Sequence, residues 1–162
     1  MEISTGSSLS QLAPSVKKIL VVEDHKDSCL WITAVLRQCG FGALEAGDGA
    51  VAVRMAHSER PDLILLDWHL PAGGGAFVME NLRRQPETAA IPIIIMTGDP
   101  DVDLELMKSK GAWAVFTKPM DVHAFLNAIR RALKDKSLDA AQAVPCPPER
   151  ESHGALVELL PG

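Results

Sequence analysis

Five short apolar runs recur along the chain, and a segment with helical character follows each one. The runs span residues 18–22, 41–46, 63–66, 93–96 and 114–116. Apolar runs of this length are typical of buried strands. Strands that alternate with helices predict a parallel sheet covered by helices on both faces. Because crossovers are right-handed, we expect a doubly wound α/β fold, flavodoxin-like, with five strands in the order 2-1-3-4-5.

The helices are expected between these runs and after the last of them. We predict that Asp27 caps the first helix and Asp121 the last, and that Gly40 ends the first. Residues Phe125 and Ile129, with Leu133, form an apolar stripe on the last helix. The predicted spans are 28–39, 50–57, 76–84, a helix beginning at residues 99–101 and ending near 111, and a last helix that runs to about 136.

Composition divides the chain into a core region and two ends. Residues 1–16 are rich in Ser, Thr, Gly and Gln, which predicts a flexible arm. Residues 17–136 form the expected folded domain. Pro145, Pro147 and Pro148 interrupt residues 137–162, where charges are frequent, and we interpret this segment as a tail or a truncated linker. This segment is too short to predict an output domain.

The charge and cysteine content narrow the possible functions. A net charge of −5 argues against direct nucleic-acid binding through the domain's own surface. Cys29, Cys39 and Cys146 form no metal-binding pattern, so we expect reduced thiols in an intracellular protein. The sequence shows no signal peptide and no apolar run near the ~20 residues of a membrane helix. We therefore expect a cytoplasmic protein without membrane contact.

Polar residues follow four of the predicted strands. Glu23 and Asp24 follow the first, Asp67 the third, Thr97 the fourth and Lys118 the fifth. The carboxyl ends of parallel strands meet at one edge of such a sheet, which is where ligands bind. We therefore expect three carboxylates, a hydroxyl and an ammonium group to lie together.

This set of groups suits phosphoryl transfer. Three adjacent carboxylates repel one another unless a cation joins them, and oxygen ligands favour Mg²⁺, or Mn²⁺ in its place. Asp67 could then attack phosphorus and form an acyl phosphate. Lys118 would pair with a phosphate oxygen, and Thr97 would donate a hydrogen bond to another.

Taken together, these elements resemble the receiver domain of two-component response regulators. The resemblance covers roughly residues 17–136 and is closest to the single-domain, chemotaxis-receiver type. No single motif is specific, but their order along the chain is. The matching elements are Val21-Val22-Glu23-Asp24, Leu65-Leu66-Asp67, Leu70-Pro71 with Gly75 beyond, Met96-Thr97, Gly111-Ala112 and Lys118-Pro119.

The resemblance implies a role for each matching residue. Asp67 would be the phosphoacceptor, while Asp24 directly, and Glu23 through water, would hold Mg²⁺ together with Asp67. The backbone carbonyl of His69 would be a further metal ligand. Thr97 and Lys118 would bind the phosphoryl group, and the Lys118-Pro119 peptide would be cis.

The resemblance also implies partners. The phosphoryl donor would be a sensor histidine kinase or a histidine phosphotransfer protein. Output would come from a conformational change that alters binding to an unknown downstream protein, or from homodimer formation. Such a module is not an enzyme beyond its own phosphorylation and dephosphorylation.

Three positions depart from the family pattern, Val115, Gly98 and His69; the side chain of His69 would lie beside the phosphorylation site and could influence the access of water. Receiver domains often carry an aromatic residue three positions before the lysine, as a switch coupled to the threonine; here that position is Val115, and the chain has no tyrosine. The second departure is Gly98, where alanine is common, and glycine leaves the loop after Thr97 more mobile. Trp113 and Phe116 flank Val115, but on a strand they should point elsewhere.

Other interpretations remain open. An unphosphorylated interaction module, a pseudo-receiver, would fit the absence of the aromatic switch. An aspartyl-phosphate phosphatase would need an acid two residues after the nucleophile, where His69 stands. The other histidines, at positions 25, 57, 123 and 153, are interpreted as surface residues without a shared site.

Overall fold

Five strands form one parallel sheet in the predicted order, β2-β1-β3-β4-β5. The computed structural model describes residues 15–135. Most of the expected arm and all of the expected tail, with Cys146, His153 and the predicted helix end at 136, lie outside the described residues. The strands are β1 Lys18–Val22, β2 Gly42–Ala46, β3 Leu63–Asp67, β4 Ile93–Thr97 and β5 Ala114–Thr117.

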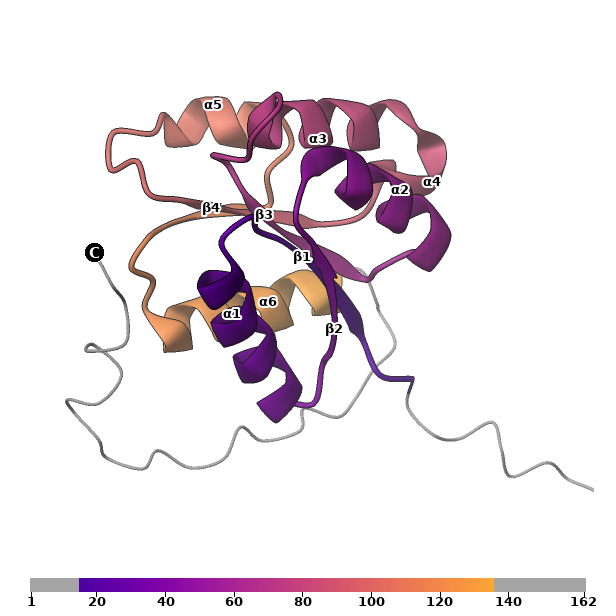
Figure 1. Ribbon diagram of the computed structural model, residues 1–162, viewed down its shortest axis with the longest axis vertical. Coiled ribbons are helices and arrows are strands. Elements are labelled where there is room, and N and C mark those ends of the chain that lie inside the picture. Colours follow the sequence, from indigo (N-terminus) through magenta and orange to yellow (C-terminus); the bar gives the residue numbers. More distant parts are fainter. Residues whose placement is uncertain (1–14, 136–162) are drawn as a thin grey trace, which may run out of the picture.

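The helices cover both faces of the sheet (Figure 1). α1 and α6 lie on one face, and α2, α3, α4 and α5 on the other. This arrangement confirms the doubly wound fold. The bounds are α1 Lys26–Gln38, α2 Gly49–Glu59, α3 Gly74–Arg84, α4 Pro86–Ala89, α5 Leu104–Ser109 and α6 Val122–Asp135.

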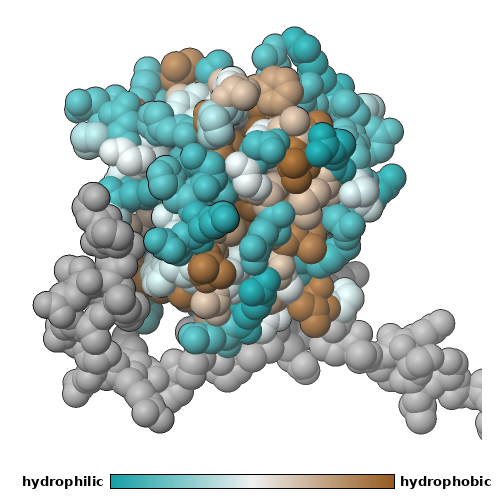
Figure 2. Space-filling view, in the orientation of Figure 1, coloured by the Kyte–Doolittle hydropathy of each residue, from teal (hydrophilic) through white to brown (hydrophobic). Residues whose placement is uncertain are grey.

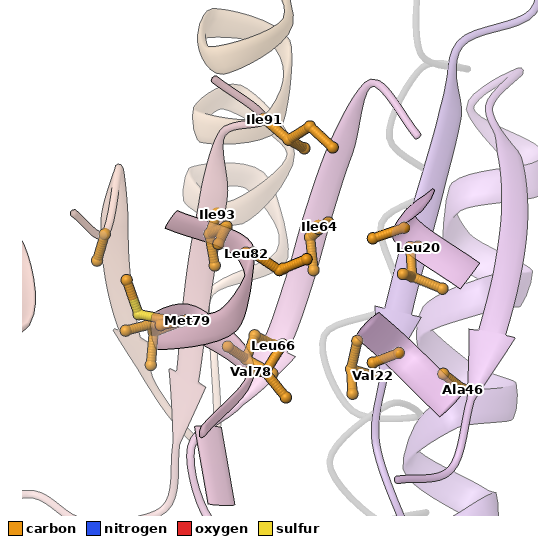
Figure 3. Packing of buried hydrophobic residues seen from close by; sticks show 14 of the residues in the cluster. Leu20, Val22, Ala46, Ile64, Leu66, Val78, Met79, Leu82, Ile91 and Ile93 are labelled. Carbon is orange, nitrogen blue, oxygen red and sulfur yellow. The ribbon is translucent and has the colours of Figure 1, made fainter. Parts of the chain in front are cut away.

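Successive strand residues supply two separate cores. Leu20 and Val22 of β1 pack with α2 and α3 on one face, as Figure 3 shows. Ile19 and Val21 pack with α1 and α6 on the other. Side chains alternate across a strand, so a strand that is covered on both faces must be apolar throughout. β1, β3 and β4 are largely apolar along their whole length because they lie inside the sheet, between β2 and β5.

Several helix starts differ from the sequence prediction: α2 and α3 begin one and two residues earlier than expected, and the shifts of α1 and α5 change which residue caps the helix. α1 begins at Lys26 after His25, so Asp27 lies in its first turn, where the helix dipole favours a carboxylate. α5 begins at Leu104, since the Asp103 side chain accepts from the backbone N–H of Leu106 at 2.9 Å. The short helix α4 was not predicted. It starts at a proline, a residue preorganised for the first helical turn.

The remaining caps agree with the sequence. Asp121 Oδ1 accepts from the N–H of Ala124 at 2.7 Å, which confirms it as the cap of α6. Gly40, with a φ of 82°, follows the end of α1 in the left-handed region that terminates helices. Phe125, Ile129 and Leu133 are buried, which confirms the apolar stripe.

Arg83, near the end of α3, fastens three segments at the edge where the strands begin. One guanidinium nitrogen, Nη1, donates to the carbonyls of Ala89 and Ile91, both at 2.9 Å. The other, Nη2, donates to the carbonyl of Gly111 at 2.7 Å, beyond α5. One side chain thereby provides hydrogen-bond donors to three backbone carbonyls at this edge.

The surface is mainly polar. Figure 2 shows hydrophilic residues over much of one face, interrupted by hydrophobic areas that lie mainly right of centre. The large apolar side chains that remain exposed in the described region are Val16, Leu30, Phe77, Leu104 and Leu106. Within residues 15–135, no helix combines the length and apolarity needed to cross a membrane.

Candidate functional site

The carboxyl ends of the strands bring the predicted polar residues together. In the register of the sheet, Val22 lies beside Leu66, and Asp67 beside Met96, so the strands end nearly level. Glu23 and Asp67 are only 2% and 4% exposed. Two buried carboxylates at one edge are costly unless cations or hydrogen-bond donors offset their charge. The structure therefore confirms the expected convergence of acidic residues.

Lys118 bridges the two buried carboxylates. Its Nζ donates to Glu23 Oε2 at 2.7 Å and to Asp67 Oδ2 at 3.0 Å. Burial alone would lower the pKa of Lys118, but the hydrogen bonds and charges of Glu23 and Asp67 outweigh it, and the pKa is raised. The ammonium group therefore stays charged at neutral pH. The peptide between Lys118 and Pro119 is cis, as the resemblance implied.

His25 is exposed, as the sequence predicted, but its ring also contacts the acidic cluster, a contact that was not predicted. Its Nδ1 lies 3.2 Å from Asp24 Oδ1 and 3.3 Å from Glu23 Oε1. The negative charge of Asp24, and then the hydrogen bond to Glu23, raise the pKa of His25. The available sequence signal was its position directly after the acidic pair and before a helix.

Asp67 and Thr97 are held by loop residues that follow their strands. Asp67 Oδ1 accepts from the backbone N–H of His69 at 2.9 Å. Thr97 is fully buried, and its Oγ1 accepts from the N–H of Asp99 at 3.1 Å and lies 3.5 Å from His69 Nδ1. The hydroxyl of Thr97 is thus engaged by the loops on either side rather than by Asp67.

An open pocket of about 350 Å³ gives access to Asp67. Lys118, His69 and Gly98 line it, together with His25 and Ser28. Ser28, on the first turn of α1, was not among the predicted site residues. No pattern in its sequence neighbourhood marks it, since its place in the pocket depends on how α1 packs.

The backbone after Asp67 explains the glycine in the matching motif. A Cβ on Gly75 would lie 2.7 Å from the Trp68 ring and 3.1 Å from the carbonyl oxygen of Asp67. Only glycine allows α3 to start so close to the end of β3. Trp68 itself packs on the core beneath α2 and α3.

The acidic cluster suits a divalent cation. One ligand atom each from Glu23, Asp24, His25 and Asp67 can be chosen so that all lie within 4.8 Å of one another. Three of these four ligands are carboxylate oxygens, the donors that Mg²⁺ prefers. The predicted contribution of the His69 carbonyl stays a prediction.

The structure confirms the directions predicted for the aromatic residues in and next to β5. Val115 packs against the core that contains α2 and α3. Trp113 and Phe116 pack against the opposite core, where Phe116 meets Phe125 edge-to-face with ring centroids 5.3 Å apart. No aromatic ring from these positions can therefore take the place that Val115 leaves.

Comparison with known proteins agrees with this geometry. The family model of the response regulator receiver domain matches residues 19–130. Protein PilH of Pseudomonas aeruginosa is 35% identical over 117 residues, which cover 72% of this chain and 97% of PilH. Sporulation initiation phosphotransferase F of Bacillus subtilis is 31% identical, covering 75% of this chain and 97% of that protein.

Longer relatives and solved structures share the same domain. The phosphate regulon regulator PhoB of Escherichia coli is 34% identical, but the chain spans only 56% of its length. The receiver domain of a Pseudomonas aeruginosa sensor histidine kinase, solved with magnesium in its active-site cleft, is 30% identical. It aligns with a TM-score of 0.68, over 74% of this chain and 98% of that domain. The chain belongs to the family of response regulator receiver domains.

Proposed function

We propose that Asp67 accepts a phosphoryl group from a phosphohistidine on a sensor histidine kinase or a histidine phosphotransfer protein. The observation that carries this proposal is the position of Asp67. It is a buried carboxylate at the carboxyl edge of the sheet, bonded to Lys118 and clustered with Glu23 and Asp24. A carboxylate placed there is the nucleophile that acyl-phosphate formation needs.

In the proposed reaction, a carboxylate oxygen of Asp67 forms a bond to phosphorus while the bond from phosphorus to the donor's imidazole nitrogen breaks. The imidazole leaves with the bonding electron pair and takes up a proton. Lys118, already 3.0 Å from Asp67, stays within reach of the transferred group. A divalent cation held by Glu23, Asp24 and Asp67 would supply positive charge that offsets the charge on phosphorus oxygens.

Thr97 is the proposed link between chemistry and conformation. Its hydroxyl is held by the loop residues Asp99 and His69. A phosphoryl group on Asp67 offers charged oxygens, which are stronger acceptors than neutral groups. We propose that the hydroxyl turns to donate to one of them, and that the loop before α5 rearranges as a result. With Val115 in place of an aromatic residue, this loop carries the signal.

The output of this module is proposed to be protein binding. α5 exposes the side chains of Leu104 and Leu106, each at 46%, and offers an apolar contact beside the loop that Thr97 controls. A downstream protein or a second copy of the chain could bind there. The acidic net charge does not favour direct nucleic-acid binding. A histidine-kinase donor and cysteines without a metal or disulfide pattern favour a cytoplasmic location.

The test is incubation with acetyl phosphate and Mg²⁺, followed by intact-mass measurement. We expect one phosphoryl adduct on the wild-type protein and none on Asp67→Asn. Omission of Mg²⁺ with EDTA present should suppress the adduct. Lys118→Ala should slow its accumulation.

Two outcomes would contradict the proposal. A wild-type protein without any Mg²⁺-dependent adduct would instead favour the unphosphorylated interaction module. An equal adduct on Asp67→Asn would move the phosphoacceptor to another residue.

A further inference from the structure

The imidazole of His25 adds a nitrogen donor to a site whose other side-chain ligands are all oxygens. Its Nδ1 lies among the carboxylate oxygens of Glu23 and Asp24. We propose that His25 is a metal ligand of this chain, and that it shifts the site's preference from Mg²⁺ toward divalent transition metal ions. This inference rests on the proposed metal site but not on phosphoryl transfer itself.

The spacing of the donor atoms fits neighbouring ligands of one ion. Nδ1 of His25 lies 3.2 Å from Asp24 Oδ1 and 3.3 Å from Glu23 Oε1. An octahedral ion with bonds of about 2.1 Å places adjacent ligands about 3.0 Å apart. The four candidate ligand atoms, with Asp67 included, span no more than 4.8 Å, close to the separation of opposite ligands.

The backbone holds His25 in this position. It is the N-cap residue of α1, and its carbonyl accepts from the N–H of Cys29 at 3.0 Å. Its own N–H donates to Glu23 Oε1 at 3.1 Å. The ring is therefore fixed at its root beside the acidic pair. Such preorganisation lowers the entropic cost of binding an ion.

Lys118 does not compete for the same oxygen of Glu23. It binds Oε2 of Glu23 and Oδ2 of Asp67, whereas His25 lies against Oε1 of Glu23. An ion bound between Oε1, Asp24 and the imidazole would leave the lysine bridge in place. The side chain of His25 is 75% exposed, so an ion can approach it from solvent.

Ligand chemistry predicts which ions benefit. Mg²⁺ gains little from a nitrogen ligand because it is a hard cation that prefers oxygen. Imidazole suits Zn²⁺, Ni²⁺ and Co²⁺, and affinity for nitrogen and oxygen sites rises from Mn²⁺ through Co²⁺ to Ni²⁺. His25 should therefore raise the affinity for Co²⁺ far more than the affinity for Mg²⁺.

The same distances also fit an imidazolium group hydrogen-bonded to the carboxylates. In that arrangement His25 would occupy the place of the cation and oppose metal binding. The two arrangements predict opposite effects of removing the ring, which makes them separable by experiment.

The test is calorimetry at one fixed pH, with Mg²⁺ and Co²⁺ added separately to the wild type, His25→Ala and Asp24→Asn. We expect His25→Ala to weaken Co²⁺ binding by about tenfold or more and Mg²⁺ binding by less than about twofold. Asp24→Asn should weaken both, which shows that the ions bind at this site. His57→Ala, a histidine on the last turn of α2, is the matched control and should leave both affinities unchanged.

A spectroscopic measurement identifies the ligand directly. Mn²⁺ bound to the wild type should show coupling to a coordinated ¹⁴N nucleus in pulsed electron paramagnetic resonance, and His25→Ala should lose it. Equal effects of His25→Ala on Co²⁺ and Mg²⁺, or tighter binding of both, would overturn the inference. Wild-type protein that binds neither ion would overturn the metal site of the proposed function instead.

Discussion

Single side chains around Asp67 control what reaches its carboxylate. His69 donates its backbone N–H to Asp67, lines the open pocket and places its exposed ring near Thr97. Such a ring restricts the approach of water to a group on Asp67. If Asp67 is phosphorylated as proposed, we expect the lifetime of the acyl phosphate to depend on this side chain.

We expect His69→Ala to shorten the half-life of the aspartyl phosphate by about threefold, because the missing ring opens the pocket to water. The measurement is loss of the phosphoryl adduct by intact mass after removal of acetyl phosphate. His57→Ala serves as the control. An unchanged half-life for His69→Ala would show that the ring does not shield the site.

Cys29 lies within α1, and Cys39 directly follows it. Cys29 is buried and Cys39 only partly so, and we therefore expect them to differ in reactivity. Cys29 is 7% exposed, and burial, followed by the charge of Glu45, raises the pKa of its thiol. Fewer thiolates and less access both slow reaction with a disulfide reagent. In a Cys146→Ser background, Cys39 should react at least about tenfold faster than Cys29. Comparing Cys29→Ala with Cys39→Ala separates the two rates; similar rates would contradict the burial of Cys29.

At the residue scale, the sequence revealed the charged groups but not all of their contacts. Asp67, Glu23 and Lys118 could be predicted because each ends or directly follows a strand of a parallel sheet, and the topology brings these positions together. His25 could not be assigned, because its place depends on where α1 begins. The N-cap residue of α1 is His25 rather than the predicted Asp27, and this start of the helix places the His25 ring beside the acidic pair.

At the scale of elements, Arg83 connects α3, the start of β4 and the turn after α5. Its guanidinium donates to three carbonyls that no other described side chain satisfies at comparable distance. The neighbouring Arg84 makes only an exposed ion pair with Glu80. Variants of the two arginines therefore compare a partly buried set of hydrogen bonds with an exposed ion pair in the same turn of helix.

We expect Arg83→Ala to lower the free energy of unfolding by about 2 kcal/mol, since it leaves carbonyls without donors. Arg84→Ala should change it by less than about 0.5 kcal/mol, the usual value of an exposed pair. Urea unfolding followed by circular dichroism measures both. Equal losses for the two variants would remove the distinction.

Element boundaries were predicted less well than element order. The helix expected from residues 99–101 starts at Leu104, because Asp99 and Asp103 are both good caps and only packing selects between them. α4 is too short to show a period in the sequence. The order of strands, by contrast, follows from rules of crossover that do not depend on exact boundaries.

At the scale of the whole molecule, one sheet separates two hydrophobic cores. Ile94 and Ile95 are adjacent in β4 and fully buried, yet they belong to different cores. A cavity made on one face should not be filled by relaxation of the other.

We expect Ile94→Val and Ile95→Val each to cost about 1 kcal/mol of unfolding free energy. Although the two residues are adjacent in the chain, the double variant should show the sum within about 0.5 kcal/mol, because their side chains belong to different cores. Denaturant unfolding of the wild type, the two single variants and the double variant gives the four free energies of this double-mutant cycle. A coupling well above that limit would mean that the two cores relax together.

We expect the hydrogen bond between Arg83 and Gly111 to limit how α5 can move. The C-terminal end of α5 leads to Gly111, whose carbonyl accepts a hydrogen bond from Arg83. The N-terminal end of α5 follows the loop whose Asp99 binds the Thr97 hydroxyl. A helix that is held at one end and free at the other would pivot about the end that is held. The displacement of α5 that follows a sub-ångström change at Thr97 would then be largest at the exposed leucines, Leu104 and Leu106, and smallest near Gly111, where Arg83 binds.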